Sequence, residues 1–329
     1  MAGTPFHGGQ WSQERGEGSL SAASSFGDTL AARVAERESQ IVLGLDPDPS
    51  SLWPGAGANL AGDLSPAQAA AAAVLEHCRA LIDAAGQACV AVKPQLARFE
   101  LLGAAGWAAL EAVVAHAHSA GLLAIADAKR GDIDVTAAAY GGALFGGADS
   151  PFGQIEGLRA DLATVNPLMG SDAIEPFVSA ARAIGSGVLV LVRTSNPGAA
   201  DIEDLELAGS ETVWERLAAL VEQLGAPGVG EAGLSDVGAV IGATEPGHLQ
   251  RARELMPHTP FLLPGVGVQG GRVEDLAPAF APGQAGGLVS ASRSIAGAHR
   301  VAGGEPAAAA RAEAERLREV AWGLYDRVR

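Results

Sequence analysis

The sequence predicts an α/β fold, a (β/α)8 TIM barrel in a single domain, and three observations lead to it. Short apolar runs recur along the whole chain, helix-like segments separate them, and no linker divides the chain after residue 25. Eight such runs is the strand count of one barrel, whereas a doubly wound sheet uses fewer. A length of 329 residues allows two domains at about 150 residues each, but barrels often exceed that size in one domain.

The eight runs predict the strands of the barrel. Each is apolar almost throughout instead of alternating, as is typical of strands buried on both faces of a parallel sheet. In chain order they span 40–46, 89–94, 122–127, 162–167, 187–192, 237–243, 261–265 and 287–292.

Helices are expected between the strands. Ser65 followed by Pro66 indicates a helix start, because serine caps helices and proline is favoured at the first position. That helix runs to about Gly86, and the others are expected over 99–119, 172–184, 210–224, 246–256, 273–280 and 305–328, with a weaker one over 132–146. Residues 1–25 are rich in Gly and Ser and predict a flexible N-terminal tail, which leaves 26–329 for a catalytic barrel with a C-terminal helix.

Composition excludes several classes of protein. There are 38 acidic and 22 basic residues, a net charge of −16, which argues against non-specific nucleic-acid binding. No signal peptide and no apolar run long enough for a membrane span are apparent. The two cysteines, Cys78 and Cys89, are too few for a disulfide framework, so we expect reduced thiols and a cytoplasmic location.

Charged residues gather where a barrel keeps its active site, at the carboxyl ends of the strands. The first strand ends at Asp46, the second at Lys93 and the third at Asp127, with Lys129 and Asp132 just beyond. Asp127 and Lys129 are two residues apart, so in extended chain they point the same way. Two carboxylates and two ammonium groups thus alternate on adjacent strands. A structural salt-bridge cluster would have the same composition, but the placement on the active face favours a functional site.

The last two strands predict a phosphate site. The segment Pro264–Gly271 contains G-x-G-x-x-G, but the acidic residue that a dinucleotide fingerprint needs about 20 positions later is missing. Loops after the seventh and eighth strands of barrels often bind phosphate, and here they supply Gly N–H groups, Gln269 and Arg293. The fifth strand leads into a further polar residue, Ser195.

These residues resemble the orotidine 5′-phosphate decarboxylase family, in its longer bacterial subgroup. DAKRGD at 127–132 is similar to the family's D-x-K-x-x-D signature. The flanking blocks LDPDP, AVKPQ, TVNPLMGSD, VRTSNPG, LLPGVGVQGG and SASRSI follow in the family's order over roughly residues 40–300. The departures are the N-terminal tail, an acidic loop at 197–209 and the extended C-terminal helix, none of which removes a matched residue.

The resemblance implies conversion of orotidine 5′-monophosphate to uridine 5′-monophosphate and CO₂ in pyrimidine biosynthesis, without a cofactor or metal, by a homodimer. It also implies a role for each matched residue: Lys93, Asp127, Lys129 and Asp132 form a charged tetrad, Asp132 and Thr136 reach into the partner's site, Asp46 holds the ribose hydroxyls, Ser195 bonds the pyrimidine, and Gln269 with Arg293 grips the 5′-phosphate.

Two alternatives remain. Metal-dependent phosphosugar decarboxylases and aldolases of the same superfamily share D-x-K-x-x-D but have an acidic residue where this chain has Lys93, whose charge would repel a cation. The other is a catalytically silent barrel that only binds a nucleotide phosphate. A silent binder has no need of a complete set of two lysines and two carboxylates.

Overall fold

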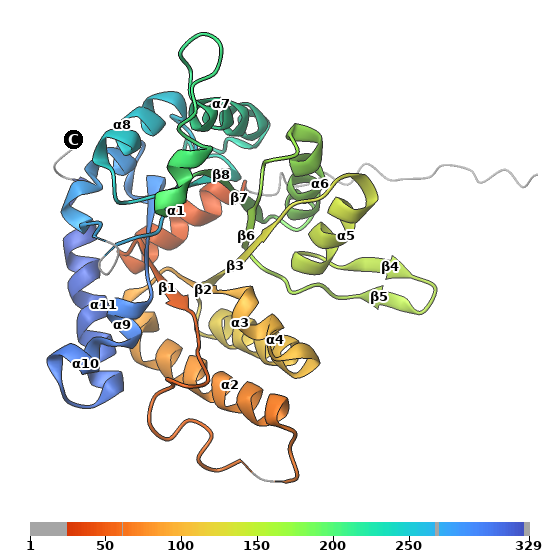
Figure 1. Ribbon diagram of the computed structural model, residues 1–329, viewed down its shortest axis with the longest axis vertical. Coiled ribbons are helices and arrows are strands. Elements are labelled where there is room, and N and C mark those ends of the chain that lie inside the picture. Colours follow the sequence, from red (N-terminus) through yellow and green to blue (C-terminus); the bar gives the residue numbers. More distant parts are fainter. Residues whose placement is uncertain (1–24, 61, 267–269, 326–329) are drawn as a thin grey trace, which may run out of the picture.

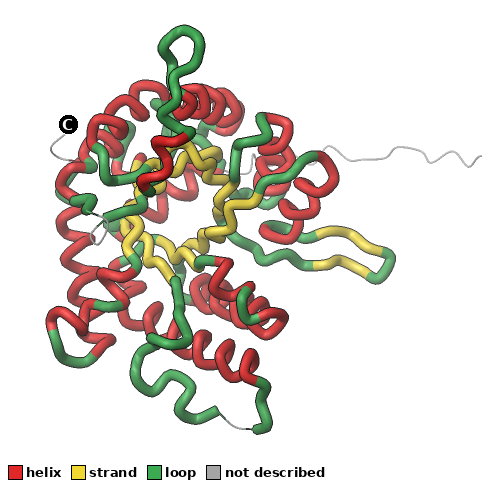
Figure 2. The backbone as a smooth tube through the Cα atoms, in the orientation of Figure 1, coloured by secondary structure: helices red, strands yellow, loops and turns green. Residues whose placement is uncertain are grey.

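The protein folds as a closed barrel of eight parallel strands, which confirms the predicted fold class. The structure is a computed structural model, and it describes residues 25–60, 62–266 and 270–325. Figure 2 shows the strands as a ring surrounded by helices. In order around the ring, the strands are β1 (Ile41–Leu45), β2 (Ala91–Pro94), β3 (Leu123–Arg130), β6 (Leu162–Val165), β7 (Gly187–Arg193), β8 (Val237–Ile241), β9 (Phe261–Leu263) and β10 (Gly287–Ala291). Each overlaps one of the eight predicted apolar runs.

Seven long helices cover the outside of the ring (Figure 1). They are α2 (Pro66–Ala85), α4 (Gly103–Ser119), α5 (Asp134–Leu144), α6 (Ser171–Arg182), α7 (Val213–Gly225), α8 (Pro246–Leu255) and α11 (Pro306–Trp322). The predicted start of α2 is confirmed: the Ser65 side chain accepts a hydrogen bond from the Gln68 backbone N–H, and the Gln68 side chain accepts one from the Ser65 N–H, which forms a capping box.

A helix that the sequence reading did not include, α1 (Phe26–Arg37), closes one end of the barrel. Its residues Phe26, Leu30 and Val34 recur every four positions and belong to a buried cluster with inward-facing residues of the strands, such as Val42 and Leu288. Burial of each such side chain contributes about 1.5–3 kcal/mol to stability. The i, i+4, i+8 spacing was the available sequence signal for this helix.

Three of the predicted helices need correction. The segment 99–119 divides into α3 (Leu96–Glu100) and α4, because Gly103 takes a left-handed φ of 63° between them. The segment 273–280 forms 3₁₀ turns, η4 (Val273–Asp275) and η5 (Ala277–Phe280), since Pro278 has no N–H to donate within an α-helix. The terminal helix α11 ends at Trp322, before Gly323, and residues 326–328 of the predicted span lie outside the described residues.

Short elements complete the chain. An antiparallel hairpin of β4 (Ala148–Ser150) and β5 (Gly153–Ile155), which was not predicted, projects from the barrel between α5 and β6 (Figure 1). The other short elements are α9 (Arg293–Ala296), α10 (Ala298–Ala302), η1 (Gly86–Ala88), η2 (Pro197–Asp201), η3 (Ala226–Gly228) and η6 (Gln284–Gly286). Within the described part of the chain, no helix is both long and apolar enough to cross a membrane.

Candidate active site

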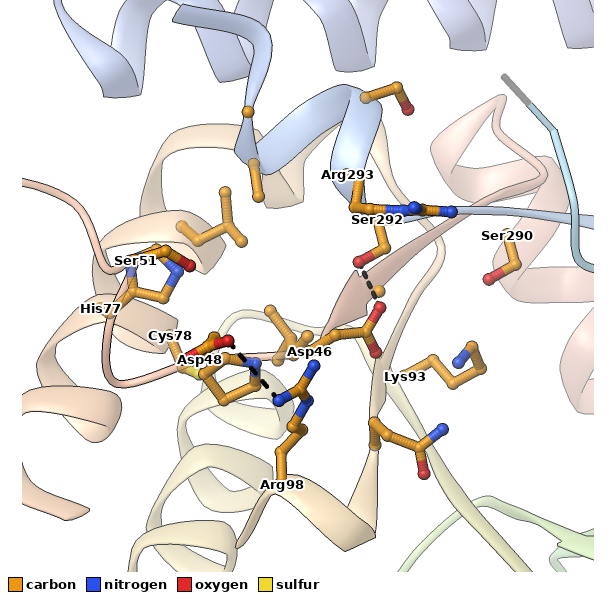
Figure 3. A pocket seen from close by; sticks show the side chains of 18 of the residues that line it. Asp46, Asp48, Ser51, His77, Cys78, Lys93, Arg98, Ser290, Ser292 and Arg293 are labelled. Carbon is orange, nitrogen blue, oxygen red and sulfur yellow. Dashed lines mark hydrogen bonds and ion pairs between the residues drawn. The ribbon is translucent and has the colours of Figure 1, made fainter. Parts of the chain in front are cut away.

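A cavity of about 760 Å³ opens at the end of the barrel opposite α1. Residues at the carboxyl ends of β1, β2, β9 and β10 line it, together with α2, α9 and α10. Figure 3 shows Asp46, Lys93 and Arg293 around this space, with Ser290 and Arg98 nearby. Three of the residues singled out from the sequence therefore share one cavity at the face where barrel enzymes bind their substrates.

The charged groups of β2 and β3 meet on one carboxylate. Lys93 Nζ donates to Asp127 Oδ2 at 2.5 Å, and Lys129 Nζ forms an ion pair with Asp127 Oδ1. The Lys93 side chain is 9% exposed and lines the cavity, whereas the Lys129 side chain is 46% exposed. The structure thus brings these three residues together.

Burial and charge act in opposite directions on the pKa of Asp127. Its buried position favours the neutral acid, but the ammonium groups of Lys93 and Lys129 outweigh that effect and hold the pKa of the carboxyl below its ordinary value of 3.8. Asp127 is consequently a carboxylate at neutral pH, fixed between two cations.

The backbone at Lys129 is unusual in a way that the sequence did not reveal. The residue has a φ of 49°, in the left-handed region that a lysine rarely adopts, and the pairing of β3 with β6 shifts register between Ala126 and Arg130. Its N–H donates to Thr164 Oγ1 at 2.9 Å, which stabilises this conformation. Strained backbone of this kind gathers at functional sites, where the surrounding structure holds it.

Two polar residues that sequence reasoning missed also bind Asp127. Gln95 Nε2 donates to Asp127 Oδ2 at 3.2 Å, and Thr164 Oγ1 donates to Asp127 Oδ1 at 3.1 Å. Gln95 lies two positions after Lys93, on the same face of an extended chain, and Thr164 is the polar residue of an otherwise apolar strand. Those two patterns were the sequence signals for them.

Asp46 lies just after β1 and accepts a hydrogen bond from Ser292 Oγ at 2.5 Å (Figure 3). Gly44 makes this approach possible, because a Cβ at that position would lie 2.6 Å from the Ser292 Cβ. The next residue, Arg293, is the first of α9 and lines the cavity. The Asp46 carboxylate and the Arg293 side chain thus line the same cavity, at the junction of β1 and β10.

Ser195 lies two residues after the end of β7, and it packs against the end of β8. A Cβ on Gly242 would lie 2.9 Å from the Ser195 Cα, so the glycine admits the serine backbone at contact distance. The Gly242 N–H also donates to the Arg193 carbonyl at 2.7 Å. The position of Ser195 therefore depends on how the backbone from Arg193 to Ser195 packs against Gly242.

In the part of the chain that the structure describes, Asp132 and Thr136 make no hydrogen bond or ion pair with the two lysines of the same chain. Asp132 follows β3 and accepts a hydrogen bond from the Ile133 N–H at 2.8 Å, while Thr136 is exposed on α5. Among the described residues, no hydrogen bond or ion pair connects Asp132 with Lys93 or Lys129. Gln269 lies outside the described residues.

The fold and the site together define a class: a (β/α)8 barrel enzyme with a buried carboxylate between two lysines and an arginine at the same mouth. Such an array suits an anionic substrate and a reaction that develops negative charge. The chain belongs to the orotidine 5′-phosphate decarboxylase / HUMPS family, whose model matches residues 39–312.

Individual relatives agree with this assignment. The orotidine 5′-phosphate decarboxylase of Rhodopirellula baltica is 42% identical over 233 residues, which are 70% of this chain and 75% of the relative. That of Deinococcus radiodurans is 39% identical over 272 residues, 82% of this chain and 89% of the relative. The structure of Leishmania donovani OMP decarboxylase superposes with a TM-score of 0.66 at 32% identity, covering 90% of this chain and 99% of the other.

Proposed function

We propose that this chain converts orotidine 5′-monophosphate to uridine 5′-monophosphate and CO₂ as a cofactor-independent carboxy-lyase in pyrimidine biosynthesis. The observation that carries the proposal is the Asp127 carboxylate held between the ammonium groups of Lys93 and Lys129, in a barrel of this family. Both the relatives and the geometry support the same reaction.

The chemistry requires a cation at the reacting carbon. When the bond between C6 of the pyrimidine and its carboxylate breaks, CO₂ leaves and the electron pair stays on C6 as a carbanion with no conjugated electron sink. Lys129, the more exposed of the two lysines, would stabilise that charge and donate a proton from Nζ to C6. Asp127 beside the departing carboxylate would repel it, and Lys93 would keep Asp127 ionised.

The other contacts of the substrate are assigned to the rest of the predicted site. Asp46 would hold the ribose hydroxyls, Ser195 the pyrimidine, and Gln269 with Arg293 the 5′-phosphate. The position of Asp46 and Arg293 on the wall of one cavity supports the first and last of these roles. Binding energy from a phosphate far from C6 can close loops over the substrate and thereby assist the reaction.

We further propose that the enzyme is a homodimer, with Asp132 and Thr136 of each chain completing the site of the other. Ile133 and Val135, which are the neighbours of these residues, are 54% and 74% exposed, so two apolar side chains lie on the surface beside Asp132 and Thr136. A second copy packed on this surface would bury them and bring Asp132 towards the lysines.

The chain organisation and location are part of the same proposal. One buried cluster contains residues from Ile41 to Leu324, which supports a single catalytic domain over 26–329. The tail expected at 1–25 lies, up to residue 24, outside the described residues. Cys78 and Cys89 are free and buried, as suits a protein of the reducing cytoplasm.

The metal-dependent alternative is disfavoured by charge. Both oxygens of Asp127 already face ammonium groups, and a divalent cation placed there would meet Lys93 and Lys129 at close range. The silent binder is disfavoured because a binding site alone does not need a buried lysine–aspartate–lysine array, which is costly to desolvate.

A spectrophotometric assay tests the proposal. Purified protein should consume orotidine 5′-monophosphate at an undiminished rate in EDTA. Turnover that disappears in EDTA and returns with Mg²⁺ would identify the metal-dependent alternative instead. Absence of turnover under both conditions, with retained binding of uridine 5′-monophosphate, would identify the silent binder.

A further inference from the structure

In the acidic loop between β7 and α7, the side chains of Glu203 and Asp204 are less exposed than those of the neighbouring acidic residues. The loop projects from the barrel as the green segment before α7 (Figure 1). Asp201 and Glu206 are exposed, but the side chains of Glu203 and Asp204 are 19% and 31% exposed. Both turn back to the end of β7, towards Arg193.

Arg193 is the last residue of β7, and its side chain is 12% exposed. Its guanidinium binds Asp204 with two parallel hydrogen bonds, Nε to Oδ1 at 2.8 Å and Nη2 to Oδ2 at 2.9 Å, and Nη1 lies 3.7 Å from Glu203 Oε2. Paired hydrogen bonds of this kind fix both partners in orientation as well as in distance. Arg193, Glu203 and Asp204 are called the Arg193 cluster below.

The Arg193 cluster also holds the residue that precedes Ser195. The Thr194 N–H donates to Glu203 Oε2 at 2.8 Å, and the Thr194 carbonyl accepts from Arg193 Nη1 at 2.5 Å. The N–H and the carbonyl of Thr194, which belong to consecutive peptide units, are therefore both bound by the cluster. Thr194 Oγ1 donates onward to Asn196 Oδ1 at 2.7 Å, on the other side of Ser195.

The base of the loop is itself anchored to α7. The Trp214 N–H donates to the Glu203 carbonyl at 2.9 Å, the Val213 N–H donates to the Leu205 carbonyl at 3.0 Å, and Trp214 is buried. The backbone of the loop at Glu203 is consequently tethered to α7. The Arg193 cluster therefore connects α7 to the chain that follows β7.

From this arrangement we infer that the acidic loop is a positioning device for Ser195, with Arg193, Glu203 and Asp204 as positioning residues. The inference rests on the proposed function, because it takes Ser195 as the contact to the pyrimidine. The cluster and the contact with Gly242 hold the serine from two sides. A misplacement of about 1 Å in a substrate-positioning group can cost about 10²-fold in rate.

The test is a double-mutant cycle in kcat/KM for orotidine 5′-monophosphate. Arg193→Met should lower kcat/KM by about 10²-fold, and in a Ser195→Ala background the same change should cost less than about threefold, because its effect passes through Ser195. Arg193→Lys keeps the positive charge but not the paired hydrogen bonds, so its kcat/KM should lie between that of Arg193→Met and that of the wild type. Effects that simply add in the double variant would overturn the inference.

A matched control separates positioning from stability. Arg182 makes the same paired contact with Asp236, Nε at 2.6 Å and Nη2 at 2.8 Å, but at the start of β8, on the far side of the barrel from the mouth. Arg182→Met should lower the melting temperature and leave kcat/KM of the folded enzyme unchanged. Asp204→Asn is a milder probe of the cluster if Arg193→Met does not fold, and it should lower kcat/KM in the same direction.

Hydrogen exchange provides a second readout that does not need turnover. Arg193→Met should accelerate exchange of the Thr194 amide and the amides up to Leu205, whereas Arg182→Met should not. If the wild type is inactive on orotidine 5′-monophosphate, the proposed function fails while this measurement still decides whether the cluster orders the loop. Unchanged exchange in Arg193→Met would overturn the inference whatever the activity.

Discussion

Lys93 and Lys129 bind opposite oxygens of Asp127, yet one lysine is buried and the other is half exposed. A buried lysine with a buried partner is a fixed countercharge, since moving either group would leave a charge without solvent or partner. A lysine whose side chain is half exposed can meet a substrate. The shared carboxylate thus separates two roles that the sequence alone presents as two identical side chains.

For Lys129→Ala we expect loss of turnover by at least about 10³-fold, because the charge on C6 and the proton donor are both removed. Binding of uridine 5′-monophosphate, followed by calorimetry, should persist, and the melting temperature should stay near that of the wild type. Activity within tenfold of wild type would show that another group delivers the proton.

Lys93→Ala should behave differently, because it removes the buried partner. Loss of the 2.5 Å contact leaves the Asp127 carboxylate partly unpaired in a buried position, and about 3 kcal/mol of unfolding free energy should be lost. Urea unfolding of both lysine variants at pH 7 measures this directly. The two roles would have to be abandoned if Lys129→Ala proved the less stable of the pair.

Arg293→Ala should reduce kcat/KM for the phosphorylated substrate by about 10²-fold, as expected for loss of a charge-assisted contact worth about 2–3 kcal/mol. Orotidine without its phosphate supplies the control, because wild type and variant should then act equally poorly. An equal loss on both substrates would place Arg293 outside the phosphate site.

Stability should depend on pH through His77 on α2. The Trp53 N–H donates to His77 Nδ1 at 3.1 Å, and burial lowers the pKa of His77 from 6.5 to about 4. The folded state keeps the ring neutral while the unfolded chain takes up a proton below pH 6.5. The stability contribution is therefore complete above pH 6.5 and is lost as the pH falls towards 4, by roughly 2–3 kcal/mol.

His77→Asn offers the test, since the Asn Oδ1 can accept the same hydrogen bond and does not titrate. Unfolding free energies from pH 7.5 to 4.5 should fall more steeply for the wild type than for the variant. Parallel curves would mean that His77 does not contribute to the acid sensitivity.

The proposed dimer predicts complementation between two inactive variants. Lys129→Ala and Asp132→Ala, unfolded together and refolded as a 1:1 mixture, should recover about a quarter of wild-type activity. Half of randomly paired dimers are mixed, and in each of those one site receives Lys129 and Asp132 intact from different chains. If Asp132 acted within its own chain, every site in the mixture would lack one group and no activity would return.

Much of the fold was predictable because its signals are local. Eight apolar runs became eight strands, and the Ser65–Pro66 start of α2 followed from capping chemistry. The helix over 273–280 was predicted wrongly because Pro278 outweighs the apolar spacing. The α1 helix was missed although its i, i+4, i+8 apolar spacing was a local signal, and the apolar residues that it packs against are spread over many strands.

The site shows the same division. Asp46, Lys93, Asp127 and Arg293 could be found by their place at strand ends, which the barrel brings to one mouth. The left-handed Lys129 and the hydrogen bonds from Gln95 and Thr164 arise from tertiary register, which has no local signature. Likewise, no feature of the sequence distinguishes Glu203 and Asp204 from the exposed acids beside them.

The α1 helix determines the end of the barrel at which substrate can enter and products can leave. Of the two ends of the barrel formed by the described residues, α1 fills one with Phe26, Leu30 and Val34, so the nucleotide enters at the other. Under the proposed reaction, CO₂ and the product nucleotide must leave by the route the substrate took. With the phosphate held by Arg293, as proposed, the small neutral CO₂ can leave first, past a nucleotide that is still bound.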